Sequence, residues 1–241
     1  MKRFLVPILV VVAASLVPAA PAAKGGAITG TVVVALDGKA QRNPQDVYVY
    51  LEEATPPRRP GQGMSAKITQ NNQDFDPHVV VVPAYAKVFF PNKSNEEHSV
   101  FSPPDPPLDD SFDLGRYGPS DPGKAQQFKE PHEYKIYCDI HMGMWAYVKV
   151  VPSRYIAKVV DGKFTIAGLP PGKYKAVAWT PQALDVKSEW ITISGDEART
   201  ATELHLQAKP RPVTHLRSDG SAYVYPPRRQ VLPSPAKPAH P

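Results

Sequence analysis

Residues 134–151, with the sequence YKIYCDIHMGMWAYVKVV, constrain the fold of this 241-residue chain more than any other stretch. On both sides of the central segment CDIHMGM, apolar and polar residues alternate, which is the pattern of β-strands. The sequence therefore predicts two strands joined by a short loop. That loop brings a thiol, an imidazole and a thioether together, because Cys138, His141 and Met144 follow one another at intervals of three residues.

Sulfur and nitrogen donors of this kind suit copper that cycles between Cu(I) and Cu(II). A trigonal copper site with two histidines, one cysteine and a weak axial methionine needs a further histidine, expected at the end of an earlier strand. His98 lies in the segment FPNKSNEEHSVFS, 40 residues before Cys138. The sequence therefore predicts that copper is held by His98, Cys138, His141 and Met144. Met142 competes for the axial position, although its place next to His141 favours an outward orientation.

A lone cysteine is most often a small buried apolar residue. Here the histidine and the methionine in register with Cys138, together with the histidine upstream, favour the ligand interpretation. The remaining histidines of the chain are expected to be surface or structural residues: His78, His132, His205, His215 and His240.

The segments FPNKSNEEHSVF and YKIYCDIHMGMWAYVKV resemble the cupredoxins, which are the type 1 blue-copper proteins. The Cys-x2-His-x2-Met spacing is similar to the short loop of amicyanins rather than to the longer loop of plastocyanins. Within the family, the chain is more similar to exported bacterial proteins labelled methylamine-utilization proteins. The resemblance covers about residues 67–151 and implies a Greek-key β-sandwich with one copper ion, bound by the four residues named above. Ser99 departs from the family pattern, because many cupredoxins have asparagine there to connect the ligand loops.

The segment DGKFTIAGLPPGKYKAVAW, beyond residue 151, resembles the carboxypeptidase-regulatory-like, transthyretin-like β-sandwich family. In that family such a segment follows an opening hairpin of the form GTV…DG…VYL. Here a matching hairpin occurs about 100 residues earlier, before the copper segment. We therefore expect a second sandwich that is split by the copper domain. The alternative is an N-terminal extension followed by an independent C-terminal sandwich.

The two ends of the chain are expected to lie outside both sandwiches. Residues 1–23 combine Lys2 and Arg3 with an apolar core and a small-x-small cleavage site at 20–22, which is the pattern of a secretory signal. The apolar core is short for a membrane anchor, so stable membrane insertion is not expected. Residues 209–241 are rich in proline and poor in apolar residues, which predicts disorder. The mature protein is expected to be periplasmic or extracellular.

The expected fold class is all-β, with a Greek-key cupredoxin sandwich plus a second small β-sandwich, because short Val-, Tyr- and Thr-rich runs are bounded by turn residues. The predicted domains are the signal at 1–23, the opening hairpin of the second sandwich at 27–60, the copper domain at 64–151, the remainder of the second sandwich at 153–208 and the basic tail at 209–241.

The charge distribution and the cysteine content exclude some classes of function. The formal net charge of +5 belongs to the two ends, and the body between them is slightly acidic. It contains no basic motif with interleaved aromatic residues, so nucleic-acid binding is not expected. The single cysteine excludes an intramolecular disulfide and leaves its thiol available for metal.

Three strong ligands in one plane leave no evident open position for a substrate, and no nucleophile–base arrangement can be recognised. The sequence therefore favours a monomeric, non-enzymatic protein that exchanges one electron with an unidentified redox protein. The alternative is a copper-handling or storage protein, or a structural binding module with a copper-stabilised domain.

Overall fold

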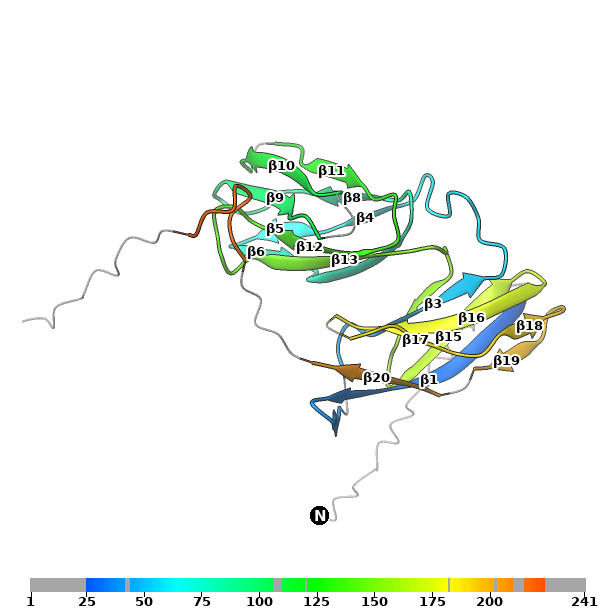
Figure 1. The fold of residues 1–241 in the computed structure, drawn as a ribbon. Coiled ribbons are helices and arrows are strands. Elements are labelled where there is room, and N and C mark those ends of the chain that lie inside the picture. Colours follow the sequence, from blue (N-terminus) through cyan, green and yellow to red (C-terminus); the bar gives the residue numbers. More distant parts are fainter. Residues whose placement is uncertain are drawn as a thin grey trace, which may run out of the picture.

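The computed structural model describes residues 25–41, 44–105, 110–119, 121–181, 183–201, 203–209 and 215–223. The predicted secretory signal lies outside these ranges. The described chain is all-β and forms two packed sandwiches, which confirms the predicted fold class (Figure 1). In this part of the chain, no helix is long and apolar enough to cross a membrane.

One sandwich contains the predicted copper segment. Its larger sheet has the strand order β10-β9-β12-β13-β7, and its smaller sheet has the order β11-β8-β4. Strands β9 and β12 are neighbours in the sheet although two other strands separate them in the sequence, so the chain crosses between the sheets. The bounds are β4 (Ser65–Lys67), β7 (Val79–Pro83), β8 (Lys87–Phe90), β9 (His98–Ser102), β10 (Phe112–Tyr117), β11 (Lys124–Gln127), β12 (Glu133–Tyr137) and β13 (Trp145–Val151), with a small hairpin of β5 (Thr69–Asn71) and β6 (Asp74–Asp76) beside them.

Alternation of side chains fills the core of this sandwich. In β8, Val88 and Phe90 point inward and are buried, whereas Lys87 and Phe89 are exposed. Side chains from both sheets form one apolar cluster, which also contains Cys138 and Met144. The loop with the predicted metal ligands is therefore anchored in the core at two of its residues.

The second sandwich combines strands from both sides of the copper segment. Strand β1 pairs with β15, and β3 pairs with β16, in both cases antiparallel. Residues of all four strands meet in one apolar cluster, which includes Ile28, Leu51, Ile166 and Ala176. The bounds are β1 (Gly26–Leu36), β2 (Lys39–Ala40), β3 (Tyr48–Glu53), β14 (Ile156–Lys158), β15 (Lys163–Leu169), β16 (Gly172–Trp179), β17 (Val186–Lys187), β18 (Ile191–Ile193), β19 (Ala198–Thr200) and β20 (Leu204–Ala208). Whether the two parts depend on each other for folding stays a prediction.

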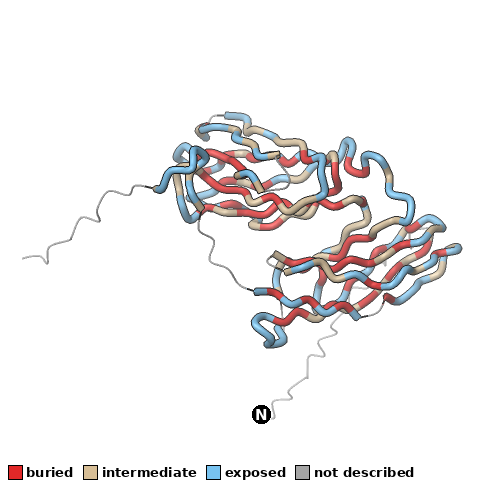
Figure 2. The backbone as a smooth tube through the Cα atoms, in the orientation of Figure 1, coloured by how far each residue is buried: buried red, intermediate tan, exposed pale blue. Residues whose placement is uncertain are grey.

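The two sandwiches contact each other through β13. Its residues alternate between two clusters: Ala146 and Val148 enter the core of the first sandwich, whereas Tyr147 packs with Trp179 of β16. This explains why the strand is almost continuously apolar, since both of its faces are covered (Figure 2). At the same interface, Trp179 Nε1 donates to Glu133 Oε2 at 3.0 Å, and burial raises the pKa of the Glu133 carboxyl.

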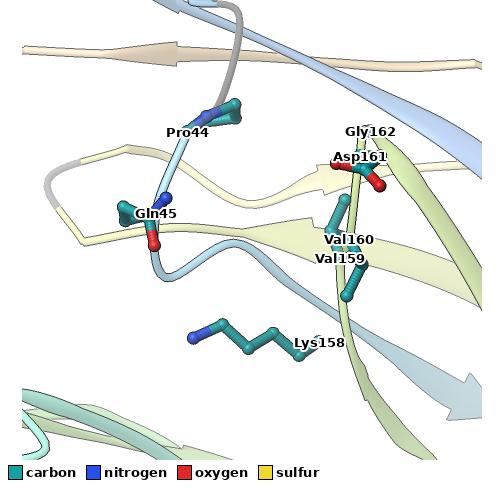
Figure 3. Close-up of a pocket in the computed structure, with 7 residues that line it drawn as sticks. All are labelled: Pro44, Gln45, Lys158, Val159, Val160, Asp161 and Gly162. Carbon is teal, nitrogen blue, oxygen red and sulfur yellow. The ribbon is translucent and has the colours of Figure 1, made fainter.

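A surface depression occurs in the second sandwich, next to the turn between β14 and β15 (Figure 3). Its lining residues are Pro44, Gln45, Lys158, Val159, Val160, Asp161 and Gly162. None of these residues is a predicted copper ligand, so the depression and the predicted metal site share no residue.

Candidate metal centre

Strand pairing brings the predicted ligands to one end of the larger sheet. His98 is the first residue of β9, and Cys138 directly follows the last residue of β12. These strands run antiparallel, with Tyr137 opposite Phe101, so the start of β9 lies beside the end of β12. His141 then follows in the loop before β13. Residues 40 positions apart therefore become neighbours because of the sheet register.

Among the described residues, His98, Cys138 and His141 form a group whose donor atoms lie close enough together to hold a metal ion. The two histidine Nδ1 atoms are 3.1 Å apart, and Cys138 Sγ is 4.0 Å from His98 Nδ1 and 3.7 Å from His141 Nδ1. A point equidistant from these three atoms lies about 2.1 Å from each, close to the bond lengths of about 2.0–2.3 Å that first-row metals make to nitrogen and sulfur. The three side chains therefore fit a trigonal metal ion without rearrangement.

Ser94 fixes which nitrogen of His98 faces the metal position. Its Oγ lies 2.7 Å from His98 Nε2 and donates to Asn92 Oδ1 at 2.8 Å. Because its single proton is directed at an acceptor, Ser94 accepts a hydrogen bond from His98 Nε2–H. The unprotonated Nδ1 then points at Cys138. Burial, and next the neighbouring His141, lower the pKa of His98, which favours this neutral form.

We expect Ser94→Ala to weaken copper binding by about 10- to 100-fold, because the His98 ring loses the partner that sets its tautomer and orientation. A titration in the presence of a competing chelator measures the change. Ser188→Ala is the matched control, since Ser188 is a buried, hydrogen-bonded serine of the second sandwich. Equal affinities of the Ser94 variant and the unchanged protein would contradict this role.

The Cys138 sulfur receives hydrogen bonds from two directions. Ile140 N–H approaches Sγ at 3.4 Å, and Ser99 Oγ donates to it at 3.9 Å. The same Ser99 oxygen accepts the backbone N–H of Asp139 at 2.6 Å. Ser99 thus connects β9 with the ligand loop, which is the task that asparagine has in many cupredoxins. Such bonds stabilise a thiolate and orient it toward a metal.

Two methionines of the loop differ in burial. Met144 is fully buried, its backbone N–H donates to the His141 carbonyl at 3.1 Å, and its side chain belongs to the same core cluster as Cys138. Met142 is 42% exposed. This difference supports Met144 as the axial candidate, and its bond to the metal stays a prediction. His141 is partly exposed, with Nε2 3.7 Å from a carboxylate oxygen of Glu96.

The other described histidines lie outside the cluster. His78 stacks on Trp145 with ring centroids 4.4 Å apart, and His215 stacks on Tyr137 at 4.0 Å. His132 and His205 each lie next to a carboxylate. His240 falls outside the described residues.

Residues 215–223 differ from the prediction of a disordered tail, because they lie against the ligand loop (Figure 1). The prediction rested on the composition of residues 209–241 as a whole. Composition does not show that His215, Arg217 and Tyr223 meet specific partners, which are the Tyr137 ring and the backbone of residues 138 and 139.

Several solved structures of copper proteins are similar to part of this chain, at low sequence identity and low TM-score. A copper-containing nitrite reductase from Thermus scotoductus SA-01 is 20% identical over 36% of this chain, with a TM-score of 0.33, and the match spans only 22% of the reductase. A purple cupredoxin from Nitrosopumilus maritimus is 22% identical over 36% of this chain and 99% of its own, with a TM-score of 0.32. Amicyanin from Paracoccus versutus is 18% identical over 42% and 98%, with a TM-score of 0.34.

These matches cover 36% and 42% of this chain, respectively, for the purple cupredoxin and the amicyanin. No protein-family model matches the chain. No curated protein matches it. The resemblance of the second sandwich to the carboxypeptidase-regulatory-like family therefore stays a prediction.

Proposed function

We propose that this protein is an exported type 1 copper protein that transfers single electrons. The observation that carries the proposal is the triangle of two imidazole Nδ1 atoms and one thiol sulfur, with His98 and Cys138 fully buried. Bound copper supplies a Cu(II)/Cu(I) couple, and this donor set is the one that blue-copper electron-transfer sites use. The secretory pattern at residues 1–23 supports action outside the cytoplasm.

The residues around the site favour electron transfer over chemistry on a substrate. His98 and Cys138 are held by strand ends, and Ser94 and Ser99 fix their donor atoms through hydrogen bonds. A site that is set before the electron arrives needs little rearrangement when the charge changes. His141 is the ligand candidate with a partly exposed side chain, so its ring edge offers the route to a redox partner. We propose a monomeric carrier with no catalytic reaction of its own.

Copper retention distinguishes a carrier from a store. Protein loaded with one equivalent of copper should be reduced and reoxidised repeatedly, and it should keep its metal in both states when a Cu(I) chelator is present. The physical reason is that three fixed donors bind either oxidation state in the same geometry. Copper content after ten redox cycles, measured by elemental analysis, checks this expectation. Rapid loss of Cu(I) on reduction would instead support copper storage or delivery.

The axial ligand can be assigned by exchanging methionines. Met144→Gln should shift the visible spectrum and lower the reduction potential, because a harder oxygen donor favours Cu(II). Met142→Gln is the matched control, and it should change both quantities much less because that side chain is exposed. Spectroscopy and voltammetry of the two variants measure the difference. A larger effect of the Met142 variant would reverse the assignment.

A further inference from the structure

The C-terminal segment 215–223 makes a compact set of contacts with the first residues of the ligand loop. The Tyr223 hydroxyl donates to the Cys138 carbonyl. Arg217 Nε donates to the Asp139 carbonyl at 3.1 Å, and the backbone N–H of Ser218 donates to Asp139 Oδ1 at 3.0 Å. The Ser218 hydroxyl reaches the same carboxylate oxygen at 3.3 Å. Every one of these bonds ends on the candidate ligand Cys138 or on its neighbour.

The same segment also contacts the strand that leads into the loop. The His215 ring stacks on Tyr137 with its plane inclined by only 9° and the centroids 4.0 Å apart. The ring of Phe101 in β9 also contacts the His215 ring in an edge-type arrangement, with centroids 6.1 Å apart. The His215 ring therefore packs on the last residue of β12, directly before the ligand loop begins.

Internal hydrogen bonds give the segment a defined shape. Arg217 N–H donates to the Ser221 carbonyl at 2.9 Å, and Gly220 N–H donates to the Arg217 carbonyl at 3.0 Å. Gly220 has φ +80°, a conformation that glycine adopts without strain. The resulting turn brings Tyr223 back beside Arg217, so both side chains reach the loop together.

The two carboxylate oxygens of Asp139 contact different parts of the protein: one binds the C-terminal segment and the other binds β10. Arg116 of β10 lies 3.1 Å from Asp139 Oδ2, opposite the oxygen that Ser218 contacts. The residue after the cysteine is therefore held between β10 and the C-terminal segment.

We propose that residues 215–223 act as a clamp that holds the ligand loop in its metal-binding geometry before metal arrives, with Arg217, Tyr223 and His215 as positioning residues. This inference rests on the proposed function, because the benefit of the clamp is for metal binding: a preformed loop lowers the entropic cost of ordering the ligands when the metal binds. It predicts that loosening the clamp affects the loop first and leaves both sandwich cores intact.

The first test uses the full-length, metal-free protein, so it does not depend on copper. In the double variant Arg217→Ala/Tyr223→Phe, amide hydrogen exchange of residues 139–144 should accelerate about tenfold or more, while β12 and the second sandwich keep their protection. The matched control is Arg199→Ala/Tyr174→Phe, which removes an exposed arginine and a hydroxyl that donates to the Pro170 carbonyl at 2.8 Å. This control should leave the loop unchanged. Unaltered exchange of the loop in the first variant would overturn the clamp.

The second test uses copper-loaded protein. The clamp variant should lose copper to a chelator about tenfold faster and should show a shifted or broadened sulfur-to-copper absorption band, because the Cys138 backbone has lost a partner. A band and a release rate equal to those of the control variant would count against the clamp. If the unchanged protein shows no such band, the copper proposal fails, whereas the exchange result on metal-free protein still decides the clamp.

Discussion

Cys138→Ser should abolish the intense visible absorption of the copper-loaded protein and weaken copper binding by more than about 100-fold. This loss is larger than the loss caused by changing a residue that only hydrogen-bonds to a metal ligand. The absorption requires a thiolate bonded to copper, and the chain has no second cysteine. The serine hydroxyl is a hard, protonated donor, so it replaces neither the charge nor the softness of sulfur. An absorption spectrum and a competition titration measure the two effects.

Thermal unfolding gives an independent measurement of how the Cys138→Ser substitution affects copper binding. Copper that binds only the folded protein raises its stability in proportion to the logarithm of the ratio of free copper to Kd, about 2.7 kcal/mol at a hundredfold excess over Kd. We expect copper to raise the Tm of the unchanged protein and to have little effect on the Cys138 variant. Metal-free samples of both proteins serve as controls for the substitution itself. Stoichiometric binding that survives the substitution would rule out the proposed site.

Removal of residues 25–53 should abolish cooperative folding of the second sandwich. Strands β1 and β3 contribute Ile28, Val32, Val49 and Leu51 to its core, each with no more than 3% of its surface exposed. Losing one such side chain costs about 2–5 kcal/mol, and a whole domain is stable by only about 5–15 kcal/mol. The remaining strands would also lose the pairing of β15 with β1 and of β16 with β3.

Nuclear magnetic resonance spectra of the shortened protein check this expectation. Signals from β15 and β16 should collapse into the narrow range of an unfolded chain, and adding residues 25–60 as a separate peptide should restore them in part. Leu51→Ala is a milder companion, which should lower the free energy of unfolding without abolishing the fold. A separate chain of residues 152–208 that unfolds cooperatively would show that the C-terminal part is independent.

The sequence predicted those parts of the site that depend on local spacing. Cys138, His141 and Met144 lie within one loop, so three-residue intervals were enough to group them. His98 required only the additional expectation that a strand end lies nearby, and the cluster of His98, Cys138 and His141 agrees with that expectation.

Long-range side-chain partners were not predictable in the same way. The hydrogen bond between Ser94 and His98 depends on the path of a turn. The sequence alone does not show which of the nearby serines reaches the histidine. The docking of residues 215–223 depends on individual side chains meeting a surface that only the folded sandwich creates. A proline-rich composition averages over such positions and therefore indicates disorder for the whole segment.

The packing of Tyr147 against Trp179 has a consequence for encounters with other proteins. Because the second sandwich covers the outer face of β13 and β7, a visiting redox protein has no access to the ligands across that face. Lys149 Nζ, 3.0 Å from Asp185 Oδ1, also joins the two sandwiches, at the end of the β12–β13 pair that lies away from the ligand loop. If the protein exchanges electrons as proposed, the second sandwich therefore limits the directions from which a partner can approach, through sterics alone.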